Sequence, residues 1–366
     1  MDGLGEIVAS LLPGSQLLAA ERLQGSPRSV VHRVHLQRGG SVQETAVVKA
    51  YVAAGEGYAR EAAALSCVPD GAPAATLAAE MSAPPVIVMR DLGSGASLAD
   101  ALLGDDPGRA QDLLMAWAVS IAQLHAATGM CRQKFEVALS KRAGESCIDV
   151  DAMPRKLRQA SDELDGLAQD AGLDWPATAA QELRDLSERF DDADRSALSP
   201  TDACPDNNVL VGSRMYLLDF EGASFWHIAW DAAYLSVPWP SCWCAWRLPE
   251  QVSLRATEAY RTAMRDAMPY VATSTFEDDV AAATVGWAFV STWWFFPSAL
   301  AGNPLTANER LIAPSRRATI LHRLQGAARN APRAELPALG SVAQQWAQHL
   351  QQQWPDEALQ LAPAFR

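Results

Sequence analysis

Two short apolar runs, framed by acidic and amide side chains, constrain the fold of this chain more than any other segment. The runs 209–211 and 215–218 are joined by a glycine-containing turn, which predicts a β-hairpin. Asn207 lies at its entry and Asp219 at its exit, on the same expected side, and Asp202 precedes Asn207 by five residues. Such residues are common in turns. They also suit phosphoryl transfer, in which one carboxylate orients a hydroxyl while an amide and a second carboxylate hold Mg²⁺.

Composition narrows the class of protein. The chain has 366 residues, 49% of them hydrophobic, enough for two lobes with a buried core. The formal charge is 30 − 43 = −13 without a basic patch, which argues against nucleic acid as a partner. No apolar run approaches the roughly 20 residues of a membrane span, and residues 1–6 lack signal-peptide features. Six cysteines suggest no disulfide framework. We expect a cytoplasmic protein with no membrane partner, and the oligomeric state stays open.

The N-terminal part combines strands with one helix. The predicted elements are strands at 30–36, 44–49 and 85–92 and a helix at 56–67. Lys49 lies at the end of the second strand, and Glu61 lies within the helix. The third strand runs into a connector that begins at Gly93. Considered alone, Lys49 is an exposed strand-end charge and Glu61 part of a solvated helix face.

The order of these elements and motifs resembles a known family. Residues 202–207 follow the pattern D-x-x-x-x-N, residues 219–221 are D-F-E, and a V-V-K strand ends at Lys49. The run 60–65 matches R-E-x-x-A-L. Together these motifs resemble the aminoglycoside phosphotransferase and choline kinase family, which shares the protein-kinase fold.

This resemblance implies a two-lobed α+β architecture. A small β-rich lobe, residues 1–92, would bind the nucleotide, and a larger, mainly helical lobe, residues 93–366, would hold the catalytic groups and the acceptor. Two predicted helices, 153–172 and 177–190, would form a helical insertion at about 150–192 that shapes the acceptor pocket. The region 250–366 is expected to be helical.

The resemblance also assigns roles to single residues. It implies that Asp202 is the catalytic carboxylate, that Asn207 and Asp219 bind Mg²⁺, and that ATP or GTP is the co-substrate. Lys49 would contact the phosphates and pair with Glu61. The remaining implied nucleotide contacts are Gly25, Ser26 and Ser29 in the phosphate loop and Met89, Asp91 and Leu92 beside the base. Glu221 and His227 would contact the acceptor.

Three departures from the family pattern stand out. The phosphate loop has the single Gly25, and Pro200 and Cys204 replace the histidines that flank the catalytic aspartate in the family. The sequence therefore leaves open a catalytically degenerate protein that binds nucleotide without turnover. No activation segment ending in A-P-E follows Asp219, which argues against a third alternative, a protein substrate.

Acceptor charge is a further expectation. The charge of −13, with Glu221 and the acids at 277–279, favours a cationic acceptor such as an aminoglycoside-like antibiotic or metabolite, although acidity also serves solubility. Such an acceptor would connect the chain with antibiotic resistance.

The remaining candidates are expected to be structural. Cys204, His227, Cys242 and Cys244 form either a zinc site or a set of packed thiols. We expect His125 to be bonded to a backbone carbonyl. Asp231 is expected to accept backbone N–H bonds from the catalytic loop.

Overall fold

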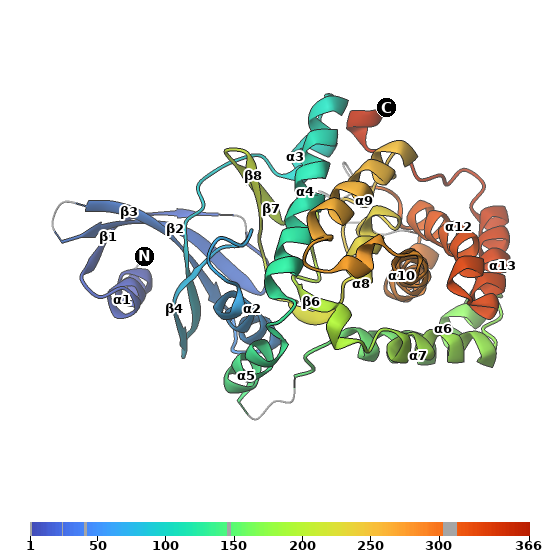
Figure 1. The fold of residues 1–366 in the computed structure, drawn as a ribbon, viewed down its shortest axis with the longest axis horizontal. Coiled ribbons are helices and arrows are strands. Elements are labelled where there is room, and N and C mark those ends of the chain that lie inside the picture. Colours follow the sequence, from blue (N-terminus) through green and yellow to red (C-terminus); the bar gives the residue numbers. More distant parts are fainter. Residues whose placement is uncertain (1, 24, 40–41, 145–147, 303–312) are drawn as a thin grey trace.

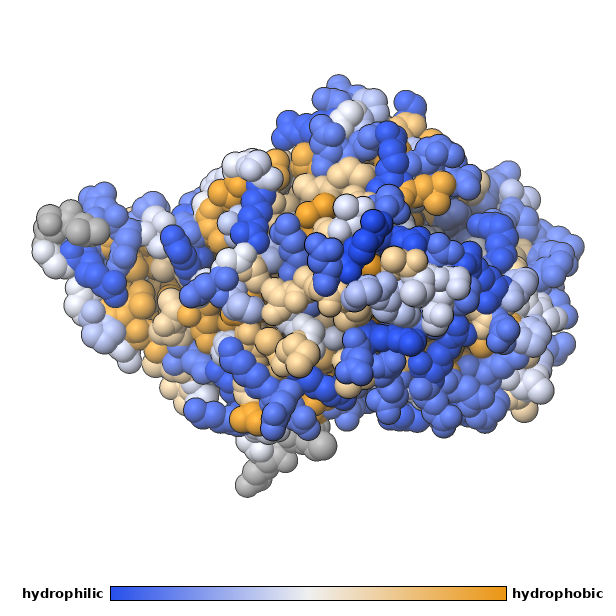
Figure 2. All heavy atoms as spheres, viewed as in Figure 1, coloured by the Kyte–Doolittle hydropathy of each residue, from blue (hydrophilic) through white to orange (hydrophobic). Residues whose placement is uncertain are grey.

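A computed structural model describes residues 2–23, 25–39, 42–144, 148–302 and 313–366. The chain forms two lobes, a small one built on a sheet and a large helical one (Figure 1). The N-terminus lies in the small lobe and the C-terminus in the large lobe. Hydrophilic residues cover most of the large lobe on the face shown in Figure 2, and hydrophobic residues are more frequent over the small lobe and the junction.

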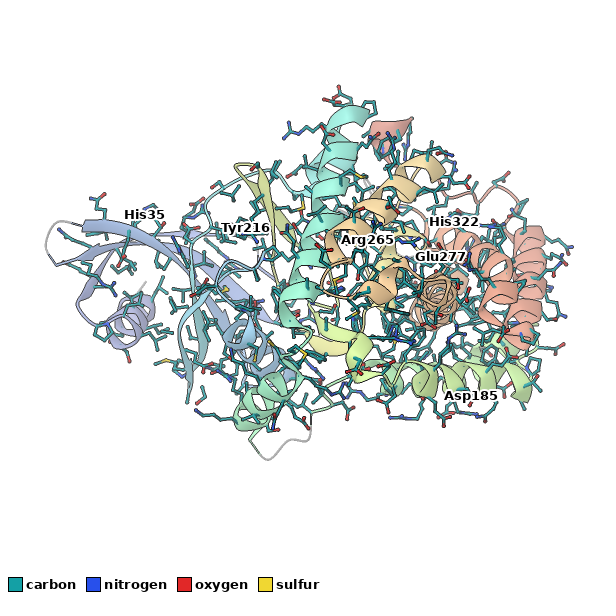
Figure 3. All side chains as sticks on the ribbon, viewed as in Figure 1. His35, Asp185, Tyr216, Arg265, Glu277 and His322 are labelled. Atoms are coloured by element: carbon teal, nitrogen blue, oxygen red, sulfur yellow. The ribbon has the colours of Figure 1, made fainter. Side chains whose placement is uncertain are left out.

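The small lobe is a five-stranded antiparallel sheet with strand order β1-β2-β3-β5-β4. Its elements are α1 (Asp2–Leu11), β1 (Ser15–Arg22), β2 (Ser29–Arg38), β3 (Val42–Tyr51), α2 (Glu56–Cys67), β4 (Leu77–Ser82) and β5 (Pro85–Arg90). The strands and the helix expected from the sequence are confirmed. His35, near the end of β2, marks the outer part of this lobe in Figure 3.

Alternation along β3 sends side chains to two different environments. Ala46 and Val48 belong to a small core that includes Val8 of α1. Lys49 and Tyr51 are also buried, and the two-residue period places them together on the opposite face, toward α2. The strand therefore carries a buried ammonium group to the side of the sheet that faces the large lobe.

The large lobe is mainly helical. Its helices are α3 (Leu98–Leu102), α4 (Pro107–Thr128), α5 (Arg132–Ala143), α6 (Met153–Asp170), α7 (Ala177–Arg189), α8 (Ala229–Ala232), α9 (Glu250–Met264), α10 (Ser274–Leu300), α12 (Arg316–Ala334) and α13 (Pro337–Gln353). Two antiparallel strand pairs accompany them, β6 (Ser196–Ser199) with β9 (Ser224–His227) and β7 (Asn208–Val211) with β8 (Arg214–Leu217). The predicted helical insertion corresponds to α6 and α7.

Helix α10 is the centre of the large core. Most of its 27 residues are buried, and it contacts α12, α6 and α8. A helix that is apolar on nearly all sides must be enclosed by other elements. Among the described residues, no single helix is long and apolar enough to cross a membrane, and one bent pair, α4 with α5, meets the criteria of length and composition alone.

Helix α5 was not predicted. It packs against α2, and only Phe135 and Leu139 of its 12 residues are buried. Two apolar residues four apart give too narrow a face for a periodic signal. The contact joins the two lobes, and the ion pair between Arg142 of α5 and Glu80 of β4 at 2.7 Å adds to it.

Candidate active site

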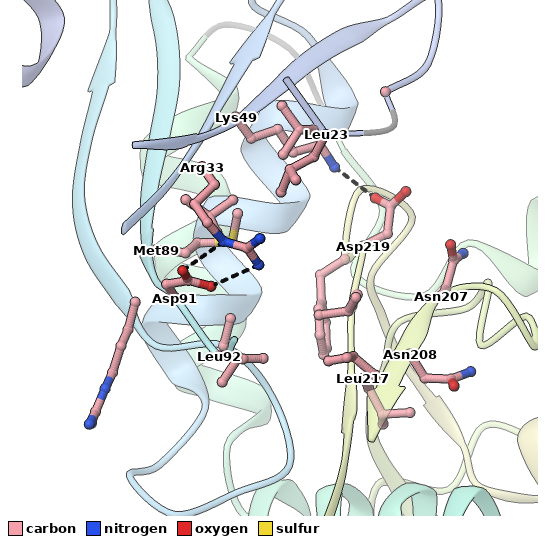
Figure 4. A pocket seen from close by; sticks show the side chains of 18 of the residues that line it. Leu23, Arg33, Lys49, Met89, Asp91, Leu92, Asn207, Asn208, Leu217 and Asp219 are labelled. Atoms are coloured by element: carbon pink, nitrogen blue, oxygen red, sulfur yellow. Dashed lines mark hydrogen bonds and ion pairs between the residues drawn. The ribbon is translucent and has the colours of Figure 1, made fainter. Parts of the chain in front are cut away.

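A cavity of about 710 Å³ lies between the lobes. Its walls come from the 23–29 loop, strands β2 and β3, the connector after β5, and the β7–β8 hairpin (Figure 4). The structure brings ten sequence-predicted residues to this one cavity: Gly25, Ser26, Ser29, Lys49, Glu61, Met89, Asp91, Leu92, Asn207 and Asp219.

The ammonium group of Lys49 joins the two lobes electrostatically. Its Nζ lies 2.6 Å from Glu61 Oε2 and 2.8 Å from Asp219 Oδ1. The side chains of Lys49 and Glu61 are only 6% and 2% exposed, and Tyr51 donates its hydroxyl hydrogen to Glu61. Burial alone would lower the pKa of Lys49, but the carboxylates of Glu61 and Asp219 raise it above its ordinary value. The ammonium group is therefore permanently charged at the inner end of the cavity.

The predicted hairpin is confirmed and positions two oxygen-bearing side chains. Asn207 donates from Nδ2 to the carbonyl oxygen of Asp202 at 2.9 Å, which leaves its Oδ1 available to a ligand. Asp219 follows β8 with φ of 58°, a left-handed conformation rare outside glycine. Figure 4 shows both side chains at the same wall of the cavity. Asp219 Oδ1 contacts Lys49, and its Oδ2 has no hydrogen bond or ion pair with any residue that the structure describes.

Asp202 lies beside this wall, in a loop with strong local constraints. Its Oδ1 accepts hydrogen bonds from Ser241 Oγ at 2.6 Å and from Cys204 Sγ at 3.0 Å. The preceding Thr201 has φ of 62°, and Tyr234 donates to its carbonyl oxygen at 2.6 Å. Left-handed non-glycine residues on both sides of one site indicate backbone strain held by the surrounding structure.

The hydrogen-bond partners predicted for His125 and Asp231 were wrong. His125 bonds Tyr260 Oη at 2.9 Å and Asp231 Oδ2 at 3.0 Å, not a backbone carbonyl. Asp231 accepts from side chains, including Ser199 Oγ at 2.9 Å, not from backbone N–H groups of the loop. Ser199 Oγ accepts in turn from Thr201 N at 2.9 Å. Asp231 therefore supports the loop that carries Asp202 through Ser199, and Ser199 is one of the several donors that a buried carboxylate needs.

The connector between the lobes is attached to the hairpin and to β2. Arg33 donates to Asp91 at 2.8 Å and to the carbonyl oxygen of Gly93 at 3.0 Å. Although burial opposes it, hydrogen bonds from Gly93 N–H and Arg33 lower the pKa of Asp91. A Cβ on Gly95 would lie 1.8 Å from the carbonyl oxygen of Leu210, so only glycine allows this contact. The role of Arg33 was not predictable from local sequence patterns, since its partner Asp91 is 58 residues away.

The 25–29 loop lines the cavity through Gly25, Ser26 and Ser29. Arg28 forms an ion pair with Glu221, whose other oxygen is 3.8 Å from Lys49 Nζ. A Cβ on Gly25 would lie 2.8 Å from the carbonyl oxygen of Ser29, which explains why the loop keeps this glycine. Glu221 therefore faces the phosphate loop and Lys49.

The acids expected to attract a cationic acceptor are already paired. Glu277 contacts Arg261 at 2.8 Å, Asp278 contacts Arg333 at 2.8 Å, and Asp279 contacts Arg189 at 3.0 Å. Figure 3 shows Glu277 within the large lobe, well away from Tyr216 on the hairpin. These ion pairs remove the main support for a cationic acceptor.

His227 does not line the cavity. It is 1% exposed, packs between Phe190 and Tyr270, and accepts from Ala229 N at 3.2 Å. A contact with the acceptor is incompatible with this burial, so that expectation is corrected. The proposed zinc ligand set is corrected as well, since the described residues that could share a cation are Cys204, Asp206 and Cys242, without His227 or Cys244.

The buried His227 predicts a pH dependence of stability. Burial lowers its pKa from 6.5 to about 4, although Asp279 opposes the shift. Between these values the unfolded state binds a proton that the folded state refuses, so the free energy of unfolding should fall as pH drops from about 6.5 to 4, by up to about 3 kcal/mol. His227→Asn, followed by urea denaturation across this range, should flatten the decline. The exposed His35→Asn should leave it unchanged, and an equally steep decline in both variants would contradict the assignment.

No family model matches the chain, and no curated protein sequence does. Solved structures do match. A choline kinase from Cryptosporidium parvum Iowa II gives a TM-score of 0.56 at 11% identity, covering 93% of this chain and 99% of that one. A choline/ethanolamine kinase family protein from Mesorhizobium loti gives 0.50 at 14% identity, with 94% and 99% covered. This chain has their protein-kinase-like fold.

An amicoumacin kinase in complex with AMP-PNP, Ca²⁺ and Ami supports the same fold, with a TM-score of 0.53 at 10% identity over 90% of this chain and 93% of that one. In the protein-kinase-like fold of this chain, the cavity lies in the cleft between the two lobes, with the β7–β8 hairpin as one of its walls. The expected two-lobed α+β architecture is thus confirmed.

Proposed function

We propose that the chain is a small-molecule kinase that transfers the γ-phosphate of ATP or GTP to a hydroxyl group of its acceptor. The observation that carries this proposal is the position of Lys49 Nζ, within 2.8 Å of both Glu61 and Asp219, at the inner end of an interlobe cavity. The phosphates of a nucleotide are negatively charged, and a charged ammonium together with a metal ion held by a carboxylate can neutralise them. The small lobe, 1–92, is assigned to the nucleotide and the large lobe, 93–366, to catalysis and the acceptor.

The proposed position of the nucleotide is based on the residues that line the cavity. Its base would lie against the backbone of Met89 to Leu92, and its phosphates would extend toward Lys49 below the 25–29 loop. Backbone N–H groups of that loop are suited to phosphate oxygens. Because Glu221 already contacts both Arg28 and Lys49, it is proposed to compete with phosphate for these cations rather than to bind the acceptor.

Mg²⁺ fits the oxygens available at the hairpin. Among the described residues, Asn207 Oδ1 and Asp219 Oδ2 have no partner, and the bond from Asn207 Nδ2 to Asp202 orients the amide. Hard cations prefer such oxygen ligands and complete their shell with phosphate and water. When bound, the ion neutralises charge on the nucleotide phosphates. Asp202, five residues before Asn207, would orient the acceptor hydroxyl toward the γ-phosphate.

The alternative is a degenerate protein that binds nucleotide without turnover, and Pro200 is its motivation. Active catalysis is favoured because the support usually expected from a histidine is supplied differently: Ser199 connects Thr201 N to Asp231. Asp202 itself retains a partly exposed carboxylate next to Asn207.

The acceptor is proposed to be a small hydroxylated molecule, with antibiotics and amino alcohols as candidates. The large lobe contributes a cation as well as acids, since Lys156 Nζ lies 5.6 Å from the ring centre of Trp226 and 5.7 Å from that of Trp294. Burial lowers the pKa of Lys156 to about 8, against the opposing effect of Asp151. The negative charge of the large lobe alone is therefore not expected to select the acceptor.

The test is a screen for phosphorylated product. The purified protein is incubated with Mg²⁺, ATP or GTP, and a panel of choline-like alcohols, aminoglycosides, other hydroxylated antibiotics and nucleosides, and products are detected by mass spectrometry. An acceptor-dependent product is expected, and Asp219→Asn should abolish both this product and the effect of Mg²⁺ on nucleotide affinity. Nucleotide binding without any product would support the degenerate alternative, and failure to bind either nucleotide would exclude both.

A further inference from the structure

Two thiols and a carboxylate converge beside the catalytic loop. The ligand atoms of Cys204, Asp206 and Cys242 all lie within 4.8 Å of one another. Both cysteines are almost fully buried, with exposed fractions of 4% and 2%. Cys204 and Asp206 belong to the loop between Asp202 and Asn207, while Cys242 comes from the segment after α8.

The segment that carries Cys242 is firmly positioned. Arg323 of α12 is buried and donates to the carbonyl oxygens of Pro238, Trp239 and Pro240 at 3.1 to 3.3 Å. Because three successive carbonyls share one guanidinium, the backbone leading to Cys242 has little freedom to move away from Cys204.

We propose that Cys204, Asp206 and Cys242 form a binding site for a thiophilic divalent cation of the Zn²⁺ class, separate from the Mg²⁺ site. Zinc takes cysteine sulfur at about 2.3 Å and carboxylate oxygen at about 2.0–2.2 Å, so ligand atoms around one ion lie roughly 3.3–3.8 Å apart. Side-chain adjustment of up to about 1 Å brings the three atoms to these distances. Sulfur ligands make the site unattractive to Mg²⁺, which prefers oxygen.

The surrounding hydrogen bonds suit this role. Cys244 N donates to Cys242 Sγ at 3.2 Å, a bond that stabilises a thiolate. Trp243 Nε1 donates to one oxygen of Asp206 at 2.7 Å, which orients the carboxylate and leaves its other oxygen for the ion. Such outer contacts fix the geometry of metal ligands.

The two carboxylates beside the thiols favour a cation, against the opposing charge of the buried Arg323 guanidinium near both thiols. Within the described part of the chain, neither Asp202 nor Asp206 forms an ion pair, although both carboxylates lie next to the buried thiols. A divalent ion would compensate this group of acids, and its binding would release the two thiol protons to solvent.

A consequence for catalysis follows, and it rests on the proposed kinase function. Cys204 Sγ donates to Asp202 Oδ1 at 3.0 Å, so loss of its proton removes a hydrogen bond from the catalytic carboxylate. Zn²⁺ at this site should therefore inhibit phosphoryl transfer even in the presence of excess Mg²⁺.

The binding test uses Co²⁺ as a spectroscopic substitute for Zn²⁺ and needs no enzymatic activity. The full chain, freed of metal by a chelator, is titrated with Co²⁺ under reducing conditions. A sulfur-to-cobalt charge-transfer band should saturate at one ion per chain and disappear on addition of Zn²⁺. Cys242→Ser should weaken Co²⁺ binding by more than about tenfold, because even the loss of a residue that only contacts a metal ligand weakens metal binding by about 10–100-fold. The matched control Cys244→Ser removes a buried thiol two residues away and should retain the band.

Three outcomes would overturn the site: no charge-transfer band in the parent chain, a band of unchanged strength in Cys242→Ser, or equal loss in Cys244→Ser. Circular dichroism checks that each variant is folded. If Cys242→Ser does not fold, Asp206→Asn provides the same test of affinity, and unchanged Co²⁺ affinity there would overturn the site. Inhibition by Zn²⁺ is then measured separately, so a chain without kinase activity leaves the binding result intact.

Discussion

Replacing Asp202 by asparagine should lower the turnover number by about 10²–10⁴-fold, the range typical of a lost proton-accepting group. Asparagine keeps an oxygen for the hydrogen bonds from Ser241 and Cys204, so the loop should stay in place. What it loses is the negative charge that orients the acceptor hydroxyl. Nucleotide affinity should change little, because Asp202 does not line the nucleotide cavity. Initial rates with a saturating acceptor, together with nucleotide titration, measure the two effects.

The control for this variant is Asp105→Asn, which removes an exposed carboxylate of the same lobe and should leave the rate unaltered. Near-normal turnover in Asp202→Asn would show that another group orients the acceptor. A parallel loss of nucleotide affinity would instead indicate that the substitution disturbs the Asn207 region.

Lys49→Met is expected to affect both stability and nucleotide binding. The substitution leaves the carboxylate of Glu61 buried, with Tyr51 as its remaining strong donor. Removing one partner of a buried ion pair costs about 3–5 kcal/mol, because the other charge is left uncompensated. Nucleotide affinity should fall as well, since the phosphates lose their ammonium contact. Urea denaturation and nucleotide titration report the two quantities independently.

A double variant separates these effects. Lys49→Met/Glu61→Gln removes the uncompensated charge and keeps an oxygen for Tyr51, so most of the lost stability should return while nucleotide affinity stays low. The exposed Lys141→Met is the matched control and should resemble the parent chain. A single Lys49→Met variant as stable as the parent would mean that Glu61 is not held as a buried anion.

Local patterns predicted much of the fold. The helix 56–67 and the β7–β8 hairpin could be located from the sequence because their signals, periodicity and a glycine turn, lie within a few neighbouring residues. The contacts of His125 and Arg33 could not be located in this way. Their acidic partners are 106 and 58 residues distant, and only tertiary packing brings them together.

The candidate site likewise combines residues that a local pattern predicts to be close with residues that only tertiary packing brings together. Asn207 and Asp219 are adjacent because one hairpin carries both, whereas Lys49 and Asp219 are 170 residues apart and were connected only through the family resemblance. The error at His227 has a physical cause. All four residues of β9 are buried, so alternation along the strand could not distinguish a side chain facing a pocket from one enclosed in the core.

The close packing of Gly95 against Leu210 would make one end of the cleft rigid as a nucleotide enters and leaves. At this end of the cleft the connections are made by backbone: Leu210 N donates to Ala96 O at 2.9 Å, and Leu217 N donates to Pro73 O at 2.8 Å. At the opposite end of the cleft, where the phosphates are proposed to lie, the lobes meet through side chains: Arg28 pairs with Glu221 and Lys49 with Asp219. The end of the cleft proposed to hold the base would therefore be a fixed template that exists before the ligand arrives. The end proposed to hold the phosphates would be an exchangeable contact, where a triphosphate would replace carboxylates as the partner of Arg28 and Lys49. Added salt should therefore weaken the hold on the phosphates more than the hold on the base.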